Sequence, residues 1–102
     1  MTVVWGDEAR AFVRAEMAKM QPLQAQRWLQ KLDKAAARLE LFPFSGHTLP
    51  EVPRLATRET AVPPYRLIYF VGDEEVTIMT VCHSRESLEE SWKPPLALVD
   101  EG

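Results

Sequence analysis

The sequence predicts an α+β domain with the element order β-α-α-β-β-β, in which a two-helix hairpin packs on a small, mainly antiparallel sheet. Three observations lead to this fold. The chain opens with a short apolar run that is typical of a strand. Two stretches then repeat apolar residues at steps of three and four, as amphipathic helices do. Finally, two runs of β-branched and aromatic residues flank Gly72 and Asp73, and this combination is a hairpin signal.

The first strand and the two helices follow one another closely. Residues 2–5 form the predicted strand, and we expect Asp7 to be the N-cap of the first helix because its side-chain oxygen can accept a free backbone N–H. Pro22 is well placed as the first residue of the second helix, which runs to about Leu41. Because the connecting loop is short, the helices should pack antiparallel and lie on one face of the sheet. Their apolar stripes are Ala9, Phe12, Val13, Met17 and Met20, then Ala25, Trp28, Leu29, Leu32, Ala36 and Leu39.

Prolines and glycines divide the second half into strands. After a linker that contains Pro43 and Gly46, residues 58–62 form a short predicted strand, and Pro63-Pro64 interrupts it. Residues 65–71 and 76–82 are the two strands of the hairpin. Residues 1–95 are therefore expected to form one domain. Residues 96–102 carry no turn or strand signal, and we expect a disordered tail.

The alternation of side chains in a strand assigns them to two faces of the sheet. Arg66, Ile68 and Phe70 share one face, so we expect a cation beside exposed apolar groups, a combination that marks an interface. In the second strand of the hairpin, the same alternation separates Thr77, Met79, Val81 and His83 from Val76, Ile78, Thr80 and Cys82. His83 and Arg85 fall at the end of this strand, where contacts and chemistry are often presented.

Composition limits the function classes. The net charge of −3 argues against a generic polyanion binder. The single cysteine, Cys82, excludes an intramolecular disulfide, and His47, Cys82 and His83 lack the close spacing of metal ligands, so we expect no metal and no cofactor. With no run of about 18 apolar residues and no basic-plus-apolar leader, we expect a cytoplasmic protein without a membrane span.

Several short motifs, in order, resemble those of the RelE/ParE superfamily, the toxins of bacterial type II toxin-antitoxin pairs. They are the pair Arg58-Glu59, the strand Tyr65-Arg66-Leu67-Ile68-Tyr69, an acidic turn, Val76, Ile78 and Val81 in the next strand, and the ending His83-x-Arg85. The linker also matches the family pattern at Phe42, Pro43, Gly46, Pro50 and Glu51. The resemblance implies the same β-α-α-β-β-β fold.

Within the superfamily, the chain is most similar to the ParE-like, or plasmid stabilisation, branch. RNA-cleaving relatives also use lysines or a glutamate on the preceding strands and an aromatic residue near the C-terminus, but no lysine lies between Lys34 and Lys93 here. The resemblance therefore implies a toxin that inhibits DNA gyrase and replication without being an enzyme. A cognate antitoxin neutralises it, with a higher-order toxin-antitoxin complex as one possible assembly. The candidate binding residues are Arg58, Glu59, Arg66, Ile68, Phe70 and Trp92.

Two alternatives stay open at this point. The first is a RelE-like mRNA endonuclease that acts on the ribosome, with Arg66, Arg85 and His83 as catalytic residues, because arginine can stabilise a developing phosphorane and histidine can transfer protons. The second is a non-toxic module that uses the same sheet to bind a protein.

Overall fold

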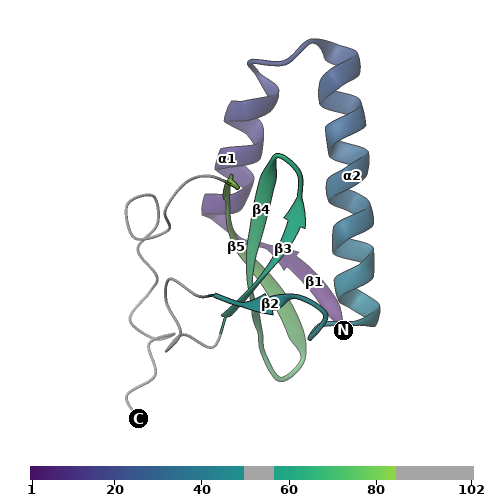
Figure 1. Cartoon of the computed structure of the whole chain (residues 1–102), viewed down its shortest axis with the longest axis vertical. Helices are drawn as coiled ribbons and strands as arrows, with labels where there is room; N and C mark the ends of the chain where they lie inside the picture. Colours follow the sequence, from purple (N-terminus) through teal and green to yellow (C-terminus); the bar gives the residue numbers. More distant parts are fainter. Residues whose placement is uncertain (50–56, 85–102) are drawn as a thin grey trace.

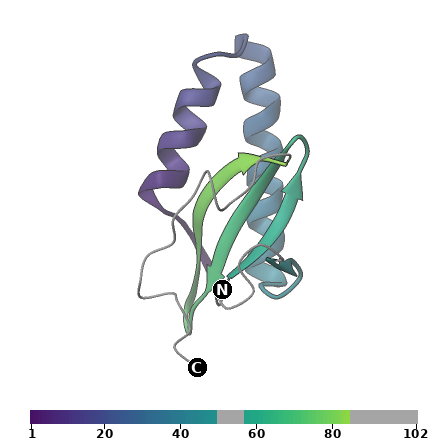
Figure 2. The ribbon, with the colours of Figure 1, turned by 60° about the vertical axis from the view of Figure 1, so that its left-hand side comes forward.

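Two antiparallel helices cover one face of a twisted sheet in the computed structural model, which describes residues 1–49 and 57–84 (Figure 1). The elements are β1 (Thr2–Trp5), α1 (Asp7–Met17), α2 (Pro22–Leu41), β2 (His47–Thr48), β3 (Thr57–Val62), β4 (Tyr65–Val71) and β5 (Glu75–His83). Figure 2 shows β3, β4 and β5 as one twisted layer with α2 behind it. The predicted α+β class and the helix hairpin are confirmed, and the two-residue strand β2 is an addition to the predicted order.

Within the described residues, the sheet has the strand order β1-β5-β4-β3-β2. β1 runs parallel to β5, and the other neighbouring pairs are antiparallel. Pro63 and Pro64, joined by a cis peptide bond, form the turn between β3 and β4. Gly72 closes the next hairpin by donating its N–H to the Glu75 carbonyl at 2.9 Å. The central hairpin is therefore the one that the sequence predicts.

The start of α1 differs from the prediction by one residue. Gly6, rather than Asp7, is the N-cap, with an extended backbone (φ −67°, ψ 162°) and no side-chain cap. Its carbonyl accepts the N–H of Arg10 at 3.0 Å, while its own N–H donates to Ile78 of β5 at 2.8 Å. Because the chain must leave the sheet at Gly6, the helix can begin only after it. Asp7 becomes the first helical residue and pairs with Arg10.

A β-bulge in β5 overturns the predicted faces of this strand. Ile68 of β4 is opposite Thr80, whereas the next residue, Tyr69, is opposite Ile78, so Met79 has no partner on β4. This extra residue reverses the alternation, as a bulge does. Val76 and Ile78 therefore share the helix-covered face with Val81, not with Thr80 and Cys82 as simple alternation predicts.

Two apolar clusters result, one on each face of the sheet. The larger lies under the helices, and its fully buried members include Leu32, Leu67 and Tyr69. The smaller lies on the opposite face and consists of Leu49, Ile68 and Cys82, with Met79 packed against them. Cys82 is buried in this smaller cluster as a free cysteine.

Candidate functional site

The structure divides the predicted binding residues between the two faces of the sheet. Glu59 and Arg66 lie on the face opposite the helices, on the neighbouring strands β3 and β4. The Arg66 Nε donates to Glu59 Oε2 at 2.8 Å, and the Nη2 atom contacts the same oxygen. Their side chains are only 12% and 24% exposed. Arg66 is therefore a largely buried, paired cation, not a side chain that extends into solvent.

The apolar surface expected beside Arg66 is not exposed as predicted. Ile68 is fully buried, because Leu49 and Cys82 pack with it. Phe70 is half-buried. The expectation of an exposed Ile68 is wrong, since the small second cluster on this face was not visible in the strand pattern. A role for Ile68 and Phe70 in binding stays a prediction.

Arg58 is the register partner of Tyr69 on β4, so both side chains point to the helix-covered face. There Arg58 contacts the linker after α2. Its guanidinium donates to the Gly46 carbonyl at 2.9 Å and lies 5.2 Å from the ring centroid of Phe44, a cation–π contact. Gly46 in turn donates its N–H to the Tyr69 hydroxyl at 2.9 Å. A Cβ atom on Gly46 would overlap the Glu59 carbonyl and the Tyr69 ring, which accounts for a glycine at this position.

His83 belongs to an aromatic and charged cluster where α1 meets the ends of β4 and β5. Its ring centroid lies 4.7 Å from that of Tyr65, and its Nε2 atom lies 3.7 Å from Glu16 Oε2. The Tyr65 hydroxyl donates to the same carboxylate at 2.9 Å. A hydrogen bond from Lys19, at 3.0 Å, is the main reason why the pKa of Glu16 is lowered. Sequence reasoning did not include Glu16 or Tyr65 in any site.

The catalytic residues of the RNase alternative do not all come together. In the β4–β5 register, Arg66 is opposite Cys82, and its side chain points to the face without helices. His83 is opposite Tyr65, and its side chain points to the helix-covered face. Arg85 and Trp92 lie outside the described residues, as do Pro50, Glu51 and the predicted tail. In the described residues, therefore, the phosphate-binding and proton-transferring groups of this alternative are on opposite sides of a sheet.

A groove between the two helices is the main feature that sequence reasoning missed. It has a volume of about 390 Å³ and lies between α1, α2 and Trp5 of β1. Leu29, which the helical pattern assigned to the core stripe, is 40% exposed in it. Its lining residues are Trp5, Arg10, Val13, Arg14, Met17, Leu29, Leu32 and Asp33. The sequence held no signal for it, because the α2 stripe has the ordinary spacing of a helix that packs on a core.

Two further properties concern metals and membranes. Residues 1–49 and 57–84 contain no cluster of three or more histidine, cysteine, aspartate or glutamate side chains that could hold a metal ion. In the same part of the chain, no helix combines the length and the apolar character that crossing a membrane requires.

Comparisons with known proteins address the family. A family model described as "ParE toxin of type II toxin-antitoxin system, parDE" matches residues 3–88. A solved structure described as "Chromosomal ParDE TA system from P. aeruginosa" has a similar fold, with a TM-score of 0.68 and 21% sequence identity. The similarity covers 81% of this chain and 95% of that chain. No curated protein matches the sequence.

Proposed function

Because this chain belongs to the ParE toxin family of type II toxin-antitoxin systems, we propose that it arrests growth in the cytoplasm by binding DNA gyrase and blocking replication. Membership of this family implies a cognate antitoxin as partner. The proposal concerns the target and the mode of action: the toxin inhibits by binding and does not cleave RNA.

The positions of Arg66 and His83 carry the preference for binding over cleavage. Cleavage of RNA needs a cation on the phosphate and a proton-transferring group within hydrogen-bond reach of the same reacting atoms. Arg66 and His83 point to opposite faces of the sheet, so one phosphate cannot contact both. Each also has a carboxylate neighbour, Glu59 for Arg66 and Glu16 for His83. These contacts favour a structural role for both side chains.

The antitoxin docks in the groove between α1 and α2. Leu29 and its apolar neighbours leave a hydrophobic surface that residues 1–49 and 57–84 do not cover, and such a groove suits one face of an amphipathic segment. Arg10 and Arg14 border it, against the single acidic group Asp33. The segment that fits is therefore apolar on one side and acidic on the other.

Gyrase inhibition and mRNA cleavage can be measured side by side with the purified chain. We expect loss of supercoiling of relaxed plasmid by gyrase, restored by the antitoxin, and intact mRNA on translating ribosomes. In cells, replication should stop and DNA damage signalling should rise while mRNA persists. His83→Ala should inhibit gyrase as well as the parent chain does, because no proton transfer is involved.

Two results would overturn this proposal. Cleavage of ribosome-bound mRNA that Arg66→Ala abolishes would identify a RelE-like endonuclease. Normal growth at a verified level of soluble protein would instead identify a binding module without toxicity.

A further inference from the structure

A stripe of four cations runs along one face of α2. The stripe consists of Arg27, Lys31, Lys34 and Arg38. Steps of four, three and four residues place them on one face of the helix, over a length of about 16 Å. All four are exposed, and none pairs with an acidic group within residues 1–49 and 57–84.

The fold itself does not require this arrangement. Like charges three or four residues apart repel each other and destabilise a helix. Arg38 lies in the last turn, where a cation favours the helix dipole, but the other three cations have no such role. The stripe is also unusual in a chain whose net charge is −3. A locally unfavourable, one-signed stripe of this kind suits an acidic partner.

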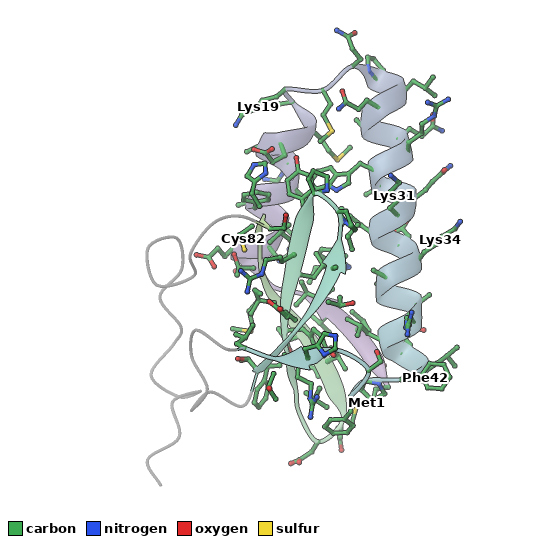
Figure 3. The ribbon with its side chains drawn as sticks, viewed as in Figure 1. Met1, Lys19, Lys31, Lys34, Phe42 and Cys82 are labelled. Carbon is green, nitrogen blue, oxygen red and sulfur yellow. The ribbon has the colours of Figure 1, made fainter. Side chains whose placement is uncertain are left out.

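Exposed aromatic side chains continue the stripe at the C-terminal end of α2. Phe42 and Phe44 are 61% and 64% exposed, and together with Arg38 they line a shallow hollow. Arg58 adds a further cation over the Phe44 ring. Figure 3 shows Lys31 and Lys34 on α2 and Phe42 at the end of the same helix. We name the set Arg27, Lys31, Lys34, Arg38, Phe42 and Phe44 the α2 surface.

The α2 surface is separate from the groove assigned to the antitoxin. Leu29 and Asp33 lie on the flank of α2 that faces α1. Arg27 and Lys31 lie on the other flank, next to Pro63 and the β3–β4 turn. A partner can therefore contact the cations without entering the groove.

We infer that the α2 surface is where the toxin contacts its protein target, through an acidic region that also offers an apolar site for Phe42. The inference rests on the proposed function, in which that target is gyrase. Arginine and phenylalanine, two residue types of the α2 surface, are enriched at protein interfaces. Lys31 and Lys34 add positive charge that complements an acidic partner. Opposite charge speeds encounter, and a buried aromatic ring provides the anchor.

A nucleic-acid partner fits the α2 surface less well. Single-stranded nucleic acid is bound by aromatic rings interleaved with cations along the track, whereas Phe42 and Phe44 both follow the stripe. A net charge of −3 also opposes the long-range attraction of a polyanion.

Two triple variants of the full chain with equal net charge test the inference. Lys31→Gln, Lys34→Gln and Arg38→Gln together remove three stripe cations. The matched control, Thr2→Glu, Ala15→Glu and Gln26→Glu, changes exposed positions that are not three or four residues from any stripe cation. Each lowers the net charge by three, from −3 to −6. Thermal melts should show both variants folded, because all six positions are exposed.

For half-inhibition of gyrase, the stripe variant should need on the order of 10-fold more protein, since several surface charge contacts are lost. The control should stay within about 2-fold of the parent, because it leaves these contacts in place. Phe42→Ala should independently require on the order of 10-fold more. The stripe variant should still bind the antitoxin, because the groove lies on the other flank.

The outcomes separate this inference from the proposed function. Equal inhibition of gyrase by the parent, the stripe variant and the control overturns the inference. Inhibition that is weakened equally in both variants also overturns it, because the effect would then depend only on total charge. Binding of plasmid DNA alone, lost in the stripe variant, would overturn it in favour of nucleic acid.

If the parent chain does not inhibit gyrase, the proposed target is wrong, and growth arrest in cells becomes the readout. Arrest lost in the stripe variant but kept in the control would leave the α2 surface as the contact with another protein target. Arrest kept in both, or absent in the parent, would overturn the surface as well.

Discussion

At the scale of residues, the two tyrosines of the chain tie distant segments to the sheet. Tyr69 is fully buried, and its hydroxyl accepts the N–H of Gly46, which holds the linker after α2. The hydroxyl of Tyr65 donates to Glu16 and so connects β4 to α1. Buried hydroxyl groups need such partners, because an unpaired one costs roughly 1–3 kcal/mol.

Both tyrosines should titrate late in the folded protein. Burial is the main cause that raises the pKa of each tyrosine above its ordinary value of 10.0. At Tyr65 the hydrogen bond to Glu16 raises the pKa further. At Tyr69 the hydrogen bond with Gly46 and the positive charge of Arg58 partly offset the rise in pKa. At pH 10, therefore, less than half of the tyrosine side chains should be ionised in the native chain, against about half in denaturant. The absorbance of tyrosinate measures this fraction. Since the folded pKa values are raised, their contribution to stability is complete below pH 10 and is lost as pH rises through the folded values.

Ultraviolet titration of the native and denatured chain measures both curves. Tyr65→Phe and Tyr69→Phe, each with one remaining tyrosine, assign the two steps. Native and denatured curves that overlap would contradict the expectation.

At the scale of elements, β5 determines which residues the helices cover. The bulge at Met79 lets Val76, Ile78 and Val81 all face the helices. Met79 itself packs against the small cluster on the opposite face. Because of this one extra residue, β5 contributes apolar side chains to both clusters, although its sequence does not alternate regularly between apolar and polar residues.

Deletion of Met79 should therefore be tolerated, because it converts β5 into a regular strand with the same faces. We expect a loss of about 1–2 kcal/mol in the free energy of unfolding, from the packing of Met79. Deletion of Thr77 is the matched control, since it would turn Val76 out of the core and Glu75 toward it, at a cost of about 3 kcal/mol or more. Denaturant unfolding followed by circular dichroism compares them. A Met79 deletion as harmful as that of Thr77 would show that the bulge itself is needed.

At the scale of the whole molecule, the chain is small and carries an apolar groove on its surface. A chain of 102 residues buries a modest fraction of its surface, so its stability is limited. A partner that binds only the folded state adds stability by mass action. The antitoxin should therefore act on folding as well as on toxicity.

The antitoxin should raise the melting temperature of the toxin. At a free concentration 100 times its Kd, the added stability is about 2.7 kcal/mol. Leu29→Gln should melt close to the parent when alone, because Leu29 is already 40% exposed, but it should lose most of the shift. Leu23→Gln, at another exposed leucine of α2 outside the groove, should keep the shift. An unchanged shift in Leu29→Gln would remove the groove as the docking site.

Local patterns were sufficient for both helices, for every strand except β2, and for the family resemblance. The helical repeats, Pro22 at the start of α2 and the hairpin from Tyr65 to His83 all depend on residues close in sequence, and the structure confirms them. The family resemblance combines short motifs of this kind, and the family match over residues 3–88 confirms it.

Only the tertiary structure decided which side chains meet. The sequence contains no sign that Met79 is an extra residue. The side chains from Val76 to Ile78 were therefore assigned to the wrong faces of the sheet. The exposure of Leu29 depends on the distance between two helices, and the burial of Ile68 depends on Leu49, nineteen positions earlier in the chain. Each of these features results from contacts between segments far apart in sequence, which periodicity along a single strand or helix cannot report.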